Sequence, residues 1–198
     1  MKIGIVSDIH CNAIGLQLAL DAMGHVDEVL CLGDAIFEYQ FSNDVVRLLR
    51  DRGAHIIQGN HEEVFLSSAG SRARERPGLD PDLIAFLAEQ PLRKELLVGG
   101  KKLLMVHSTP WEPRGEYVHP HSTKLVRFAE TDAHYVLYGH THVQVVRRVG
   151  RVLVINPGSA GDGRDSNNDR QLSCATLDTA TDEVEVLNFP DPRFAPKP

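Results

Sequence analysis

Eight side chains that can bind a metal ion stand at or just beyond the ends of short apolar runs. They are carboxylates, imidazoles and one carboxamide: Asp8, His10, Asp34, Asn60, His61, His107, His140 and His142. All offer oxygen or nitrogen donors, which suit a hard or borderline divalent cation better than a thiolate site does. Five of the ten histidines belong to this set, and those at positions 25, 55, 119, 121 and 134 lack such a context. The set predicts a metal centre if the fold brings it together.

The first two donors follow a short strand at the start of the chain. Ile3, Ile5 and Val6 predict a buried strand, so Asp8 and His10 fall at its carboxyl end. Open α/β sheets place their ligands at that edge. Because residues i and i+2 point to the same side in extended backbone, we expect Asp8 and His10 to converge on one cation.

Two further strand and helix units repeat this arrangement. Asn12 is expected to cap a helix over residues 13–23, and Ser42 or Asn43 a second helix that stops at Gly53. Each predicted strand ends in polar donors, and these strands are residues 2–6, 26–32 and 55–58. Parallel strands would bring their donors to one edge of a single sheet.

The second half of the chain has a different pattern. Residues 63–91 are mostly helical, with Asp80 capping a helix to residue 90. The basic stretch at 71–78 is expected to be a solvated surface loop, with a phosphate clamp as the alternative. Beyond residue 91 we expect a hairpin over 96–106, a helix over 122–130 and strands at 135–138, 143–149, 151–155, 171–177 and 183–188. The first half is thus βαβ and the second mainly antiparallel, which two packed sheets with outer helices would satisfy.

Composition narrows the class of protein. A chain of 198 residues with 42% hydrophobic content can bury its own core, so we expect a single domain over residues 1–198 with a loose tail at 190–198. The net charge of −6 does not favour an extended nucleic-acid surface or an anionic membrane. A negative protein that acts on phosphates must concentrate positive charge locally, and bound metal ions would do so.

Cysteine usage and hydropathy predict a cytoplasmic location. The three cysteines at positions 11, 31 and 174 form no CxxC pair, which suits a reducing compartment. No leader pattern and no apolar run of the roughly 18 residues that span a membrane stands in the sequence. The sequence leaves homo-oligomer formation open.

The strand-end motifs together resemble the calcineurin-like metallophosphoesterase family, in particular its small bacterial and archaeal single-domain phosphodiesterases. The resemblance runs from Lys2 to about Asp178 and rests on Ser7-Asp8-Ile9-His10-Cys11-Asn12, Gly33-Asp34, Gly59-Asn60-His61-Glu62, Val106-His107, Gly139-His140-Thr141-His142 and Asn156-Pro157-Gly158-Ser159. It implies an α/β fold, a four-layer αββα sandwich of two mixed sheets flanked by helices, with two divalent metal ions. It also implies hydrolysis by direct attack of a water or hydroxide that bridges the metals.

The resemblance also implies a role for each site residue. One metal would be held by Asp8, His10 and His142, the other by Asn60, His107 and His140, with Asp34 bridging the two. His61 resembles the family's proton donor, lying off the metals, and Asn12 the residue that faces the substrate phosphate. Because Asn60 would point at a metal, extended backbone would turn the adjacent His61 elsewhere, toward the substrate. Manganese is the favoured ion, and iron, zinc, cobalt or nickel would also suit the donors.

The sequence departs from the family pattern at two places and leaves the substrate open. Cys11 and Ser108 stand where this branch usually has glycine, which would narrow the approach to the metals. Arg164 is expected either to reach a phosphate or to form a structural salt bridge. A small phosphodiester is the favoured substrate. The alternatives are a phosphomonoester, a phosphoprotein and a dinucleoside polyphosphate, and a non-catalytic scaffold is the remote one.

Specificity is expected in the loops at residues 37–41, 67–80 and 111–121. Their aromatic side chains Tyr39, Trp111 and Tyr117 would either stack on a base or cover the core.

Overall fold

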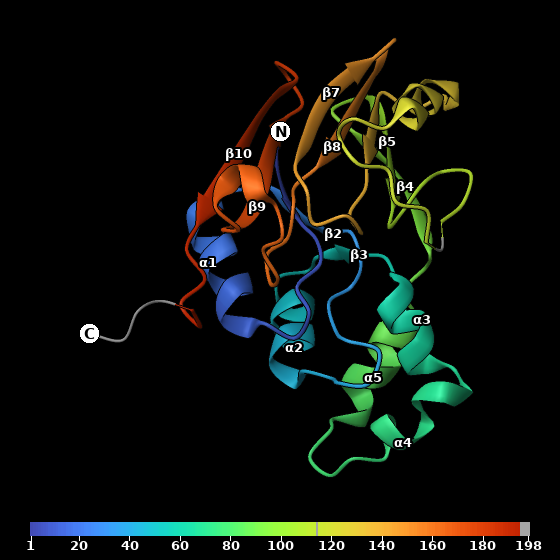
Figure 1. The fold of residues 1–198 in the computed structure, drawn as a ribbon, viewed down its shortest axis with the longest axis vertical. Helices are drawn as coiled ribbons and strands as arrows, with labels where there is room; N and C mark the ends of the chain where they lie inside the picture. The colour runs from blue at the N-terminus through green and yellow to red at the C-terminus, as the bar shows by residue number, and fades with distance from the viewer. Residues whose placement is uncertain (114, 195–198) are drawn as a thin grey trace.

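Two five-stranded sheets form the centre of the molecule in a computed structural model that describes residues 1–113 and 115–194 (Figure 1). The first sheet has the order β10-β9-β1-β2-β3. Its strands are β1 (Lys2–Val6), β2 (Glu28–Cys31), β3 (His55–Ile56), β9 (Leu172–Asp178) and β10 (Glu183–Phe189). The second has the order β4-β5-β6-β8-β7. Its strands are β4 (Arg93–Val98), β5 (Lys101–Val106), β6 (Tyr135–Leu137), β7 (Val145–Val149) and β8 (Val152–Asn156).

Both sheets are mixed, as the family resemblance implies. Strands β1, β2 and β3 run parallel, and β9 and β10 join them antiparallel. In the second sheet β5, β6 and β8 run parallel, while β4 and β7 form antiparallel edges. The expectation of a mainly antiparallel second half is confirmed for the pairs β4–β5, β7–β8, β9–β10 and β1–β9, but the centre of the second sheet is parallel. Local hairpins account only for its edges, and its centre is made by crossovers between strands distant in sequence.

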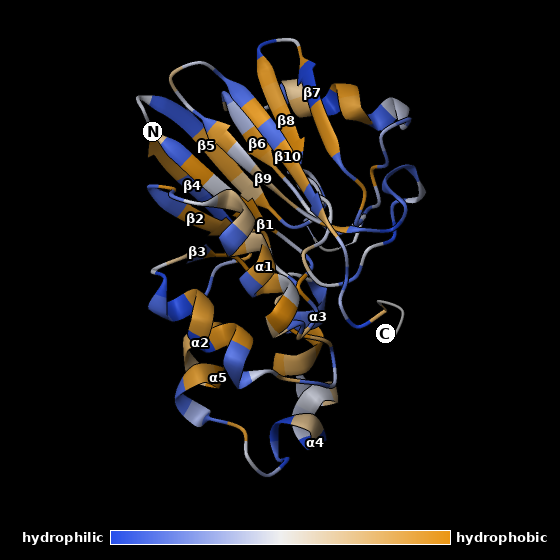
Figure 2. Ribbon diagram, turned by 90° about the vertical axis from the view of Figure 1, so that its left-hand side faces the viewer, coloured by the Kyte–Doolittle hydropathy of each residue, from blue (hydrophilic) through white to orange (hydrophobic). Residues whose placement is uncertain are grey.

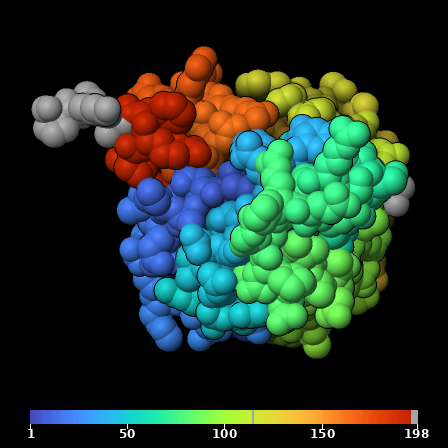
Figure 3. All heavy atoms as spheres, turned by 90° about the horizontal axis from the view of Figure 1, so that it is seen from below, coloured from blue at the N-terminus to red at the C-terminus, as the bar shows by residue number. Residues whose placement is uncertain are grey.

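The helices cover the outer faces of the sheets. They are α1 (Ala13–Met23), α2 (Asn43–Asp51), α3 (Asn60–Leu66), α4 (Ser71–Arg74), α5 (Pro81–Ala88), and the 3-10 segments η1 (Ser68–Gly70), η2 (Thr123–Glu130) and η3 (Ser166–Asn168). The predicted caps are confirmed at Asn12, Ser42 and Asp80, whose side chains each accept a backbone N–H of the following helix. Seen from below, the segment from α2 to α5, in cyan and green, covers much of the molecule (Figure 3).

The basic segment at 71–78 is not simply a loop, because its first four residues form α4. The Arg74 guanidinium donates to the backbone carbonyls of Phe65 and Ser67. Arg74 therefore binds carbonyl groups at the end of α3. This contact agrees with a structural connection rather than a phosphate contact.

Three apolar clusters hold the layers together. The cluster between the sheets joins Ile3, Ile5 and Leu30 of the first sheet to Met105 and Leu137 of the second. A second cluster lies under α1, α2 and α5, and a third lies between the second sheet and η2. Figure 2 shows the apolar residues, in orange, gathered on the strands and on one side of these helices. The fold is therefore a sandwich of two mixed sheets with helices outside.

Within residues 1–113 and 115–194, no helix is both long enough and apolar enough to cross a membrane. Residues 195–198, the end of the predicted tail, lie outside the described part of the chain.

Candidate metal centre

The strand-end donors of the two sheets meet in one place. Three groups of side chains have potential ligand atoms within 4.8 Å of one another: Asp8, His10 and His142; Asp34, His107 and His140; and His10, Asp34 and His61. Asp8, Asp34 and Asn60 follow strands of the first sheet, whereas the histidines at 107, 140 and 142 follow strands of the second. The centre therefore lies where the ends of both sheets face each other.

The first cluster has the spacing of metal ligands. His142 Nε2 lies 3.2 Å from Asp8 Oδ1 and 3.0 Å from His10 Nε2, and the Asp8 to His10 separation is 3.9 Å. Bonds of about 2.0–2.2 Å to a shared cation place neighbouring ligand atoms roughly 3–3.5 Å apart. These three atoms can therefore share one cation without large movement.

The second cluster is centred on His107. Its Nε2 lies 3.1 Å from Asp34 Oδ2 and 3.1 Å from Asn60 Oδ1, and the His140 ring is 5.0 Å away between centroids. Asp34 also belongs to the group with His10 and His61. A carboxylate has two oxygens, so Asp34 stands where it can serve both clusters.

Burial leaves polar atoms of these side chains without partners. The predicted aspartate and histidine ligands are all buried, with exposed fractions between 0% and 6%. Asp8 Oδ1, His10 Nδ1 and His140 Nε2 have no hydrogen-bond partner. Buried polar atoms are almost always paired, because an unpaired one loses its hydration without compensation. Two of these atoms, Asp8 Oδ1 and His140 Nε2, belong to the donor set, so the centre fits a divalent cation better than it fits a closed core.

Backbone carbonyls fix the orientation of two imidazoles. The Nδ1 atoms of His107 and His142 lie 2.7 Å from the carbonyl oxygens of Leu32 and Asp162. A carbonyl only accepts, so each Nδ1 carries a proton and each Nε2 faces the cluster.

The electrostatics favour ionised carboxylates. Burial would raise the pKa of Asp8, but the His142 imidazole, 3.2 Å away, lowers it below its usual range. Burial would likewise raise the pKa of Asp34, and His107 lowers it. Burial lowers the pKa of His107, yet the Asp34 carboxylate raises it to about 10. Metal binding would therefore release a proton from His107.

Two of the imidazoles are held neutral. Burial lowers the pKa of both His10 and His140 to about 4. The neutral ring is the form of histidine that binds a metal.

The backbone at the donors is left-handed rather than extended. The φ angles are 53° at Asp8, 48° at His10, 52° at Asp34, 66° at His140 and 57° at His142. Asp8 and His10 do converge, but the expected reason, alternation in extended backbone, is wrong. This conformation costs roughly 1–2 kcal/mol for each residue with a side chain. The strain is therefore concentrated at the candidate ligands.

Comparison with known proteins identifies the family. Residues 1–182 match the model of the calcineurin-like phosphoesterase superfamily domain. The chain belongs to this superfamily. It is thus a hydrolase that acts on phosphate ester bonds.

Similar proteins span nearly the whole phosphoesterase chain. An uncharacterised protein of Methanocaldococcus jannaschii is 27% identical, covering 93% of this chain and 86% of its own length. The structure of a metallophosphoesterase from Sphaerobacter thermophilus has a TM-score of 0.75 at 23% identity, with 96% and 88% of the two chains covered. The structure of an archaeal phosphodiesterase has a TM-score of 0.61 at 25% identity, with 96% and 100% covered.

His61 of the phosphoesterase lies in a helix. Asn60 and His61 are the first residues of α3, so the expectation that extended backbone turns His61 away from Asn60 is wrong. His61 Nε2 lies 3.7 Å from Asp34 Oδ2, and its Nδ1 contacts the backbone N–H and the carboxylate of Glu38. The ring is partly exposed and packs edge-on against His10 at 4.9 Å. The His61 ring therefore lies beside Asp34 and His10, on a side of the centre that is open to solvent.

Glycines allow the loops to approach this closely. A Cβ atom on Gly59 would lie 2.2 Å from Asp34 Oδ1, and one on Gly139 would lie 1.9 Å from Ser7 Oγ and 2.7 Å from Asp8 Oδ2. Any side chain at these two positions would displace a candidate ligand.

Glu62 supports the centre, and the sequence analysis assigned it no role. It is fully buried, and its carboxylate accepts the backbone N–H groups of Asp34 (2.8 Å), Ile36 (3.1 Å) and Gly59 (2.7 Å). A glutamate three residues after the helix cap is one half of a capping box, the half that remains when the cap is Gly59, and it could have indicated this residue. Glu62 ties the loop that carries Asp34 to the start of α3.

The Asn-Pro-Gly-Ser turn supports the other side. Asn156 donates to the Gly139 carbonyl at 2.8 Å and to the Thr141 hydroxyl at 3.1 Å. Ser159 Oγ donates to the Asp8 carbonyl at 2.7 Å and accepts the N–H of Asp162 at 2.7 Å. This turn therefore joins the loops of both sheets that carry the first cluster.

Asn12 is buried beside the centre, and both ends of its side chain are engaged. Its oxygen accepts the Gly15 N–H at 2.9 Å, and its nitrogen donates to the Gly161 carbonyl at 3.2 Å. Its role at the substrate phosphate stays a prediction.

The two departures from the family pattern have local partners. The Cys11 thiol lies 3.4 Å from the Gln40 carbonyl, and burial raises its pKa to about 11, so it is not a nucleophile at neutral pH. Ser108 Oγ donates to the carbonyl of Glu116.

Arg164 is paired with Asp162, at 2.8 Å from its Nε, which agrees with the salt-bridge alternative. Asp162 is the residue whose carbonyl orients His142. The arginine therefore helps to hold the loop around the first cluster.

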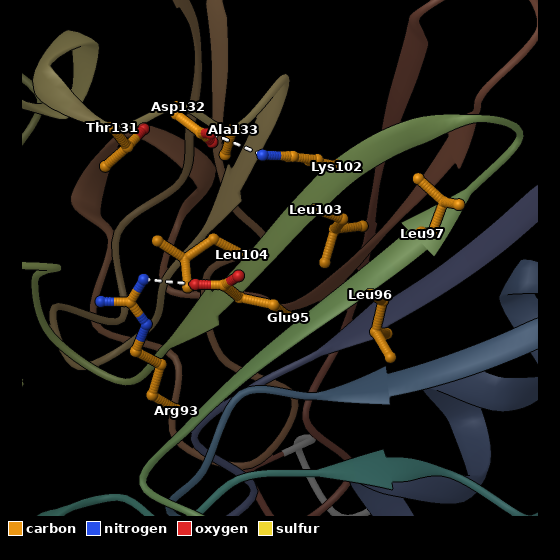
Figure 4. A pocket seen from close by; sticks show the side chains of 10 residues that line it. All are labelled: Arg93, Glu95, Leu96, Leu97, Lys102, Leu103, Leu104, Thr131, Asp132 and Ala133. Carbon is orange, nitrogen blue, oxygen red and sulfur yellow. Dashed lines mark hydrogen bonds and ion pairs between the residues drawn. The ribbon is translucent and has the colours of Figure 1, made fainter.

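A separate hollow lies along β4 and β5, beside residues 131–133 (Figure 4). It has a volume of about 310 Å³ and contains none of the candidate ligands. Its charged side chains are paired with each other, Arg93 with Glu95 and Lys102 with Asp132, as the dashed lines show. We therefore place the chemistry at the donor clusters and not at this hollow.

Proposed function

We propose that the protein is a phosphodiesterase that hydrolyses a small phosphodiester by direct attack of water at a pair of divalent metal ions. The observation that carries the proposal is the pair of donor clusters and the third group between them, in which Asp34 of the second cluster meets His10 of the first. The archaeal phosphodiesterase of similar structure supports the same reaction class.

The ligand allocation follows the two clusters. Asp8, His10 and His142 would hold one ion, and Asn60, His107 and His140 the other, with Asp34 between them. When bound, two such ions supply positive charge for the phosphoryl oxygens and lower the pKa of a water molecule to near neutrality. Manganese is our choice among the ions that nitrogen and oxygen donors accept. The cytoplasmic location remains a prediction.

The chain's own contribution to the reaction is positioning and proton transfer. Glu62 and the turn at Ser159 hold the donor loops, and the carbonyl partners of His107 and His142 keep Nε2 free. We assign His61 the task of protonating the leaving oxygen, because its ring is the partly exposed one and its Nε2 faces Asp34. Contact of its Nδ1 with Glu38 fixes the direction of the ring.

A diester is favoured over a monoester by charge. A monoester is a dianion near neutral pH and needs more positive groups than the ions alone, whereas a diester carries a single charge. Arg164, an arginine close to the motifs in sequence, is already paired with Asp162.

A hydrolysis panel on manganese-reconstituted protein tests the proposal. It compares bis-p-nitrophenyl phosphate, p-nitrophenyl phosphate, cyclic nucleotides and dinucleoside polyphosphates. We expect two ions per chain by elemental analysis, faster cleavage of diesters than of matching monoesters, and no hydrolysis in excess chelator. A clear monoester preference at saturating metal would overturn the diester assignment, and full activity in chelator would overturn the metal centre.

A further inference from the structure

An exposed aromatic ring stands on a candidate metal ligand. The Tyr117 ring is stacked on the His140 ring, with 3.9 Å between centroids and 29° between planes. Yet Tyr117 is 56% exposed, whereas His140 is 6% exposed. The tyrosine therefore presents a large part of its surface to solvent at the edge of the second cluster.

The residues on both sides of Tyr117 are firmly anchored. The Glu116 carbonyl accepts the Ser108 hydroxyl, and the Glu116 carboxylate accepts Trp111 Nε1 and the Lys124 ammonium. On the other side Val118 is fully buried, and its carbonyl accepts the Tyr138 hydroxyl at 2.9 Å. The contacts of Glu116 and Val118 therefore hold the loop in a conformation that leaves the Tyr117 side chain exposed.

Trp111, in the same loop, packs on the core and not on a candidate ligand. Trp111 packs against Phe128 at 5.1 Å between centroids and lies under the Arg127 guanidinium at 4.1 Å. Trp111 therefore covers the apolar cluster under η2. Among the described residues of the loop, Tyr117 is the ring that stacks on a candidate ligand, and the His119 ring lies on from it at 6.1 Å between centroids.

We infer that Tyr117 is a specificity-determining residue whose exposed ring stacks on a nucleobase carried by the substrate. An aromatic ring held in place loses little entropy on binding, and every base offers a π face to it. The inference rests on the proposed phosphodiesterase function and narrows its substrate to esters of nucleosides or nucleotides. Tyr117 would bind the group next to the scissile phosphate, beside His140.

Binding of two phosphates that differ only in the base tests this inference without turnover. Calorimetric titration of manganese-reconstituted protein with adenosine 5′-monophosphate and with ribose 5-phosphate measures the contribution of the base directly. Stacking of a base on one aromatic ring changes affinity by about 5- to 150-fold. We expect Tyr117→Ala and Tyr117→Leu to lose a factor in this range for the nucleotide and nothing for the sugar phosphate, and Tyr117→Phe to bind both as the wild type does.

Leu97, 74% exposed in the hollow that contains none of the candidate ligands, provides the control, and Leu97→Ala should leave both affinities unchanged. Equal losses for both ligands in Tyr117→Ala, with lower manganese content, would show that the ring only shields His140 and would overturn the inference. Unchanged nucleotide affinity in Tyr117→Ala would overturn it as well. Failure of the phosphodiesterase proposal would appear separately, as no diester hydrolysis in the panel.

Discussion

Replacement of Ser159 by alanine should lower both the stability of the protein and its affinity for metal. The Ser159 hydroxyl is 1% exposed, donates to the Asp8 carbonyl and accepts the N–H groups of Gly161 at 3.2 Å and Asp162 at 2.7 Å. Alanine leaves three backbone groups, two buried and one partly buried, without this partner. At about 1 kcal/mol each, the free energy of unfolding should fall by about 3 kcal/mol. For a chain of this size that lowers the melting temperature by about 6–12 °C.

The same change should weaken metal binding. The Asp162 carbonyl orients His142, and Asp8 is itself a candidate ligand, so both lose a support in Ser159→Ala. Loss of such supporting hydrogen bonds typically costs about 10- to 100-fold in metal affinity. Thermal unfolding of metal-free protein, followed by circular dichroism, measures the first effect. Competition with a chromophoric chelator measures the second.

Ser173→Ala is the matched control for Ser159→Ala. Ser173 is also 1% exposed, and its hydroxyl donates to the Pro157 carbonyl of the same turn at 2.7 Å. This variant should lose about 1 kcal/mol of stability and keep its metal affinity. The reasoning is refuted if Ser159→Ala loses no more stability than the control, or if its metal affinity stays within about twofold of the wild type.

Three further variants test the centre. Asp34→Ala should lose more metal and more rate than alanine at any single histidine, because only a carboxylate, with its two oxygens, can serve both ions of the proposed centre. Retention of both ions and most of the rate would refute its bridging role. His61→Ala should keep both ions and lose about 10²- to 10⁴-fold in the rate of hydrolysis of nucleoside esters. The loss should be distinctly smaller for nitrophenyl esters, because their leaving group needs no proton. Equal losses of rate would contradict the acid role. Burial and the Asp34 charge raise the pKa of Glu62 to about 7 from an ordinary value of 4.5, so the folded state favours protonated Glu62. As the pH rises from about 4.5 to 7, the metal-free wild type should therefore lose up to about 3 kcal/mol of unfolding free energy relative to Glu62→Gln. The prediction is contradicted if the unfolding free energies of the two proteins change in parallel with pH.

The sequence predicted which side chains gather in one place better than it predicted their backbone geometry. Apolar runs that end in Asp, Asn or His at a glycine locate strand ends reliably, since both the hydrophobic period and the turn are local signals. The backbone conformation at Asp8 and His10 is set by hydrogen bonds to the neighbouring loop, from Asp8 N to the Gly33 carbonyl and from His10 N to the Asp34 carbonyl. No pattern within residues 7–12 reports such distant partners.

Long-range contacts also explain what the sequence analysis missed. The parallel centre of the second sheet depends on the pairing of β6 with β5 and β8, which no local hairpin signal specifies. The stack of Tyr117 on His140 joins residues from two different loops. Glu62 alone carried a local signal, the capping box at the start of α3.

The candidate ligands come from loops of both sheets, and this affects how the protein unfolds. Ions bound as proposed would act as cross-links, because each would tie loops of one sheet to loops of the other. Binding to the folded state alone adds about 2.7 kcal/mol per ion when the free metal concentration is 100 times the dissociation constant. Opening of the sandwich at this end would then require release of both ions. The resistance of the chain to unfolding, and to proteases that attack its opened form, should therefore rise and fall with the supply of metal.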